Sequence, residues 1–74
     1  MKDLDEKLAK RFLNVCDDIK NAKSVEDLMF HVGVACGFAS ELFLSNAIDV
    51  DCHTSMFHHI GVMCDEWHLK EDAR

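Results

Sequence analysis

Hydrophobic residues dominate one stretch of the chain, residues 24–48, and the segments on either side of it are far richer in charge. Between Leu28 and Ser40 this stretch has no formal charge, apart from one that His31 would gain by protonation. At about 100° per residue, its apolar residues divide between two opposite faces of a helix. The first face holds Leu28, Val32, Ala35, Phe38, Ala39 and Leu42. The second face holds Phe30, Val34, Gly37, Leu44 and Ile48, with Gly33 beside them and Glu41 as its one charged residue.

The flanking segments repeat apolar residues at three- and four-residue steps, which is the period of an amphipathic helix. Before the central stretch the apolar stripe is Leu4, Leu8, Phe12, Val15, Cys16 and Ile19. After it the stripe is Met56, Ile60, Met63 and Trp67, flanked by Phe57 and Cys64. Ser24 followed by Asp27 resembles a capping box, and Asp49 or Asp51 supplies the N-cap of the last helix. The sequence therefore predicts an all-α fold: one domain over residues 1–74, with helices near 3–22, 24–47 and 50–71.

The central helix predicts contact with another molecule. A helix that is apolar on every side has to be buried on every side. A chain of 74 residues has too little material to enclose a central helix completely. We therefore expect the second face to pair with another copy, as a homodimer, or with another protein. The predicted interface residues are Phe30, Gly33, Val34, Gly37, Glu41 and Leu44.

Gly33 and Gly37 lie four residues apart in this helix, and each costs roughly 1 kcal/mol of helix propensity relative to alanine. Two explanations stay open. The glycines let a partner helix approach closely, or they relieve crowding against a neighbouring helix of the same chain. A membrane span is not favoured, because the uncharged run has 13 residues where roughly 20 are needed.

The composition is that of a globular helical chain: 30% of residues are charged, 49% are hydrophobic, proline is absent and glycine occurs three times. The net charge is −6; residues 1–23 sum to +1, residues 24–48 to −3 and residues 49–74 to −4. This acidity argues against non-specific binding to nucleic acid or to anionic membranes. The charged start lacks the apolar run of a secretory signal, so we expect a cytoplasmic protein. Its four cysteines are then expected to be free thiols.

One segment, residues 52–68, concentrates side chains of the kinds that bind zinc. Cys64 and His68 share a helix face four residues apart, and Cys52 and His59 share another face two turns apart. The two pairs lie on opposite flanks of the apolar stripe, so one ion does not collect all four ligands. These residues are the candidates for a metal site, and no motif supports one. No motif specifies a catalytic nucleophile or a phosphate loop either, so we expect neither enzymatic activity nor a cofactor.

The simpler expectation for this segment is structural. His53 and Cys64 complete the edge of the core, while His58 and His59 face solvent. Three histidines, if buried and neutral, would lower the stability of the fold as the pH falls below about 6. These histidines are His31, His53 and His68.

The function expected from these patterns is that of a small cytoplasmic interaction or regulatory protein that binds another macromolecule, a protein first of all. In size it resembles the small accessory regulators of phages, plasmids and bacteria, although no motif carries that comparison. The alternatives are a metal-binding module, an RNA-binding helical dimer and an acidic mimic of nucleic acid. RNA binding would use Lys2, Lys7, Lys10, Arg11, Lys20 and Lys23. A mimic would use Glu26, Asp27, Asp49, Asp51, Asp65, Glu66, Glu71 and Asp72.

Overall fold

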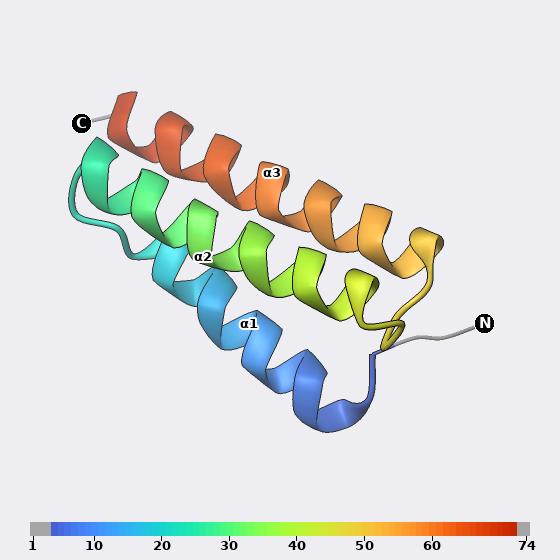
Figure 1. Cartoon of the computed structure of the whole chain (residues 1–74). Coiled ribbons are helices and arrows are strands. Elements are labelled where there is room, and N and C mark those ends of the chain that lie inside the picture. Colours follow the sequence, from blue (N-terminus) through green and yellow to red (C-terminus); the bar gives the residue numbers. More distant parts are fainter. Residues whose placement is uncertain (1–3, 73–74) are drawn as a thin grey trace.

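The computed structural model describes residues 4–72, and within them the chain forms three helices (Figure 1). These are α1 (Glu6–Lys20), α2 (Val25–Leu44) and α3 (Val50–Asp72). Successive helices run antiparallel, and each packs against the other two in an elongated bundle of 42 × 19 × 16 Å. The prediction of an all-α, three-helix fold is confirmed.

The first helix begins later than predicted, because Asp5 is its N-cap. The Asp5 backbone is extended, and its carboxylate Oδ1 accepts a hydrogen bond from the backbone N–H of Leu8 at 2.8 Å. A carboxylate at this position also suits the positive end of the helix. The predicted start near residue 3 lies outside the described residues.

Side chains in the two connections cap α2 and α3. Ser24 Oγ accepts from the backbone N–H of Asp27 at 3.1 Å, and Asp27 Oδ2 accepts in return from the backbone N–H of Lys23 at 3.1 Å. The bonds are reciprocal as in a capping box, but Asp27 reaches one residue beyond the N-cap. Asp49 caps α3, because its Oδ1 accepts from the backbone N–H of Cys52 at 2.9 Å. The structure thus selects Asp49 from the two candidates that the sequence left open.

The second helix ends three residues earlier than predicted, and this changes the place of Ile48. Asn46 has a φ of 62°, in the left-handed region. Its N–H donates to the Phe43 carbonyl at 3.1 Å, and the N–H of Ala47 donates to the Leu42 carbonyl at 2.9 Å, which is the Schellman pattern of a helix end. The chain has therefore left the helix before Ile48. The prediction that Ile48 lies on the outward face is wrong: its side chain is 2% exposed and belongs to the core.

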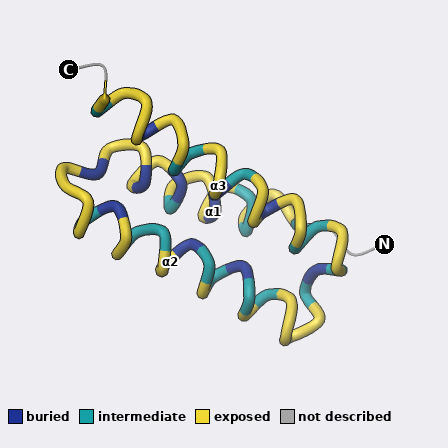
Figure 2. Tube along the Cα trace, turned by 90° about the horizontal axis from the view of Figure 1, so that it is seen from above, coloured by how far each residue is buried: buried dark blue, intermediate teal, exposed yellow. Residues whose placement is uncertain are grey.

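The core lies along the line where the three helices meet, and each helix contributes its inward positions (Figure 2). It consists of Phe12, Cys16, Ile19, Ala22, Leu28, Ala35, Ala39, Ile48, Met56, Ile60 and Trp67. Among residues 4–72, no polar or charged residue is buried. At one end the Trp67 indole Nε1–H donates to the Ala22 carbonyl at 2.8 Å. This buried bond ties the end of α3 to the connection between α1 and α2.

Candidate docking surface on the second helix

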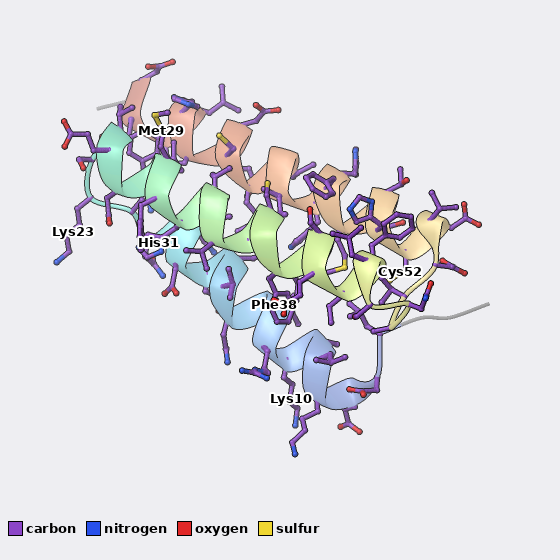
Figure 3. The ribbon with its side chains drawn as sticks, in the orientation of Figure 1. Lys10, Lys23, Met29, His31, Phe38 and Cys52 are labelled. Carbon is purple, nitrogen blue, oxygen red and sulfur yellow. The ribbon has the colours of Figure 1, made fainter. Side chains whose placement is uncertain are left out.

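The inner side of α2 contains the six residues that the sequence predicts for its first face. Leu28, Ala35 and Ala39 are buried, and the other three are half-buried against the core. Figure 3 shows Phe38 on the side of α2 that faces α1, where its ring stacks on Phe12 with 6.4 Å between centroids. This side of α2 is held inside the bundle.

The opposite side of α2 is mostly apolar and open to solvent. We call it the outer face of α2, and it comprises Phe30, Gly33, Val34, Gly37, Glu41 and Leu44. All six residues are exposed, and Phe30 and Leu44 keep 65% and 78% of their surface accessible. In Figure 2 the exposed positions follow the side of α2 turned away from the other helices. The predicted interface residues thus share one surface that nothing in residues 4–72 covers; their contact with another molecule stays a prediction.

The two glycines of this face have no internal reason to be glycine. A Cβ atom built at Gly33 or at Gly37 meets no atom of the described residues within 4 Å, apart from its own helix surroundings. Both residues also have ordinary negative φ angles, as does Gly61. The explanation by crowding inside the chain therefore finds no support. No contact within the chain therefore offsets the roughly 1 kcal/mol of helix propensity that each glycine costs.

Three further exposed apolar residues, outside the predicted interface, lie beside the outer face on the side of α2 toward α3. Met29 is 68% exposed, and Val25 and Phe43 are exposed as well. Phe43 stacks on His53 of α3, and the helical period places Val25 and Met29 on the same side of α2. Figure 3 shows Met29 on this side. These residues were missed because their helical angles lie between the two faces into which the sequence was divided.

His53 lies between two aromatic rings where α2 meets α3. Its ring centroid is 4.6 Å from that of Phe43 and 4.6 Å from that of Phe57. The imidazole Nε2 is buried and has no hydrogen-bond partner among the described residues. An unpaired buried polar atom costs roughly 1–3 kcal/mol. His53 is half-buried at the core edge, as expected, and it packs there as an aromatic ring.

The four candidate metal ligands do not come together. Within residues 4–72, no group of three or more His, Cys, Asp or Glu side chains is placed to hold an ion. Cys52 and Cys64 are half-buried against the core, and His68 is exposed. The expectation that His59 faces solvent is wrong: it is half-buried because its ring packs against Phe12 of α1, with 5.9 Å between centroids.

All four cysteines are free thiols. Burial, with a smaller contribution from the neighbouring Asp17 carboxylate, raises the pKa of the Cys16 thiol to about 11. Burial also raises the pKa of Cys36. The thiolate is the nucleophilic and metal-binding form. Cys16 and Cys36 are therefore held in their unreactive, protonated form at neutral pH.

A hollow of about 270 Å³, open to solvent, lies at the end of the bundle where α1 and α3 terminate. Its lining comprises Lys20, Asn21, Ala22, Lys23, Trp67, Lys70 and Glu71. Lys20 and Lys70 stand in the last turns of α1 and α3, where a cation stabilises the negative end of a helix. The helix ends thus account for two of the three lysines.

One helix among the described residues, α2, is long and apolar enough to cross a membrane, by length and composition alone. The uncharged run alone has 13 residues, whereas the whole helix, including its charged ends, has 20. Core helices of soluble proteins and signal sequences satisfy the same criterion. A lipid bilayer is therefore a rival occupant of the outer face.

Comparison of the chain with protein-family models, with curated proteins and with solved structures finds no match.

Proposed function

We propose that this chain is a small helical interaction protein of the cytoplasm that self-associates through the outer face of α2 and binds a protein partner with its remaining surface. The observation that carries the proposal is the exposed, continuous apolar side of α2. A soluble monomer rarely leaves a large contiguous apolar patch uncovered, and such patches mark binding sites. The open positions at Gly33 and Gly37 support the same conclusion, because they leave room for another backbone.

The competing hypotheses have less support from the arrangement of side chains. A metal-dependent module needs ligands that converge, and no such group occurs in residues 4–72. A nucleic-acid binder or mimic would act through charges, whereas the outer face of α2 is apolar apart from Glu41. We therefore propose self-association, and not metal or nucleic-acid binding, for the outer face of α2.

The test compares the molar mass in solution of three proteins by sedimentation velocity. The first is the wild type, and the second carries Phe30→Ser and Leu44→Ser on the outer face. The control carries Leu13→Ser and Leu69→Ser, which also replace exposed leucines (53% and 70% accessible) but lie on α1 and α3. Exposed substitutions usually change stability by less than about 0.5 kcal/mol, so all three proteins should give the same helical circular dichroism.

We expect the wild type and the control to sediment as dimers and the outer-face variant as a monomer of 8.4 kDa. Equal masses for all three proteins would contradict self-association through this face. A second arm adds vesicles of a neutral phospholipid and pellets them. Wild-type protein that pellets with the vesicles, while the outer-face variant stays in solution, would make the bilayer the occupant and overturn the proposal.

A further inference from the structure

The uncovered outer face of α2 has a pattern that is symmetric about one residue. We infer that its occupant is the same face of a second copy, with the two α2 helices antiparallel and crossing at Gly37. This inference rests on the proposed self-association, and it adds the register and direction of the pair. Its support comes from the spacing of the large residues, the position of the charge and the apolar area.

The two most exposed large hydrophobic residues of the outer face lie at equal distances from Gly37. Phe30 precedes it by seven residues and Leu44 follows it by seven, so the two side chains stand two turns away on either side and near the same line along the helix. A two-fold axis through Gly37 brings Phe30 of each copy opposite Leu44 of the other. The two most prominent apolar groups of the central line thus cover each other at both ends of the contact.

The charge on the face selects the antiparallel direction. Glu41 follows Gly37 by four residues, as Gly33 precedes it, so in the antiparallel pair each Glu41 lies opposite Gly33, which has no side chain to obstruct it. The two Glu41 carboxylates are then about 12 Å apart along the axis, beyond the screening length of about 8 Å in physiological salt. In a parallel pair they would stand side by side, and α2 contains no lysine or arginine to neutralise them.

The glycines determine where the helices approach most closely. Gly37 lies on the two-fold axis, where each copy presents its backbone to the other, and its Cβ position is open. Small residues at such a point let two helix axes come to the short end of the usual 8–10 Å separation. The dipoles of two antiparallel helices also attract each other, which favours the antiparallel pair.

The apolar area of the outer face supplies the larger part of what a homodimer needs. Its large apolar residues, Phe30, Val34 and Leu44, keep 65%, 43% and 78% of their surface accessible. With about 150–200 Å² for each whole side chain, these three expose roughly 300 Å² of apolar surface. A standard interface buries about 800 Å² per partner, of which about 65%, or roughly 500 Å², is apolar in homodimers.

The direction of the pair is measured by pulsed electron paramagnetic resonance between two copies. A non-natural azide-bearing residue replaces Glu26, which is exposed in the first turn of α2, and a spin label is coupled to the azide. This chemistry leaves the four native thiols unchanged. Glu26 lies eleven residues from Gly37, so an antiparallel pair separates the two labels by about 33 Å along the axis. A parallel pair holds them within about 20 Å.

A distance longer than about 30 Å that disappears on spin dilution with unlabelled protein is the expected result. A distance below about 20 Å would overturn the antiparallel register while leaving the proposed self-association intact. No intermolecular coupling at any concentration would overturn both. The control is the same label in the Phe30→Ser and Leu44→Ser background, where the distance should be lost. A long distance that persists there would show pairing through another surface and would also overturn the inference.

Discussion

The substitution of Gly37 by leucine separates the stability of the bundle from the stability of the dimer. Within one chain, a side chain at this position enters open space, because no described atom outside its helical surroundings lies within 4 Å of the added Cβ. Leucine is a far better helix former than glycine, so the monomer should gain about 0.8 kcal/mol in its free energy of unfolding. For a domain of this size that gain raises Tm by about 3 to 6 °C.

In the dimer the same change has the opposite sign. Two leucines would face each other where the helices cross, and overpacking of a tight contact costs typically 1–3 kcal/mol. That cost weakens dimerisation by roughly 5- to 150-fold. The matched control is Gly61→Leu on α3, another exposed glycine within a helix with no described atom near its Cβ. It should give the same gain in helix stability without the loss of pairing.

The assay is urea unfolding followed by circular dichroism at a low and a high protein concentration. At low concentration both variants should be more stable than the wild type. At high concentration Gly61→Leu should keep its advantage, whereas Gly37→Leu should lose it, because only the wild type and the control gain stability from dimerisation. If Gly37→Leu is as stabilising as Gly61→Leu at every concentration, nothing packs on Gly37 and the reasoning is refuted.

Three further predictions concern the bundle itself. Asp49→Ala should lower the free energy of unfolding by about 1 kcal/mol because it removes the cap of α3, whereas Asp51→Ala should cost less than half as much; equal losses in urea unfolding would contradict the assignment of the cap. Trp67→Phe leaves the buried Ala22 carbonyl without its hydrogen bond and should cost at least about 2 kcal/mol, and a midpoint within experimental error of the wild type would show that this bond contributes nothing. Because burial raises the pKa of Cys16 from 9.0 to about 11, its contribution to stability is complete below pH 9 and is lost as the pH rises toward 11. Cys16→Ala should therefore flatten the alkaline fall of the urea midpoint, and an unchanged slope would argue against this account.

Most of the fold could be predicted from local patterns in the sequence. Three segments with apolar residues at helical spacing predicted the three helices. The capping residues Ser24 and Asp49 predicted where α2 and α3 begin. The end of α2 was harder, because the hydrophobic period continues to Ile48 while the left-handed backbone at Asn46 has already ended the helix. Asparagine tolerates a positive φ, so Asn46 is visible in the sequence as one possible helix end. Whether the helix ends there depends on where the next helix has to pack.

The contacts between helices could not be derived from sequence periodicity. His59 appeared exposed on its own helix, yet Phe12 of α1 covers it. The bond from Trp67 to Ala22 joins residues 45 apart in the sequence, and it depends on how far α3 extends past the first connection. Similarly, the sequence could not decide why Gly33 and Gly37 are glycines, because that question requires knowing which atoms surround them.

The most direct test of the central claim is the molar mass of the wild-type protein in solution, measured by light scattering on a sizing column over a range of concentrations, with and without a chelator. We predict a mass of twice 8.4 kDa that falls toward the monomer on dilution and does not change with chelator. A monomer at every concentration would contradict self-association through the outer face of α2. A dimer that dissociates when chelator is added would instead place a shared metal ion at the centre of the assembly.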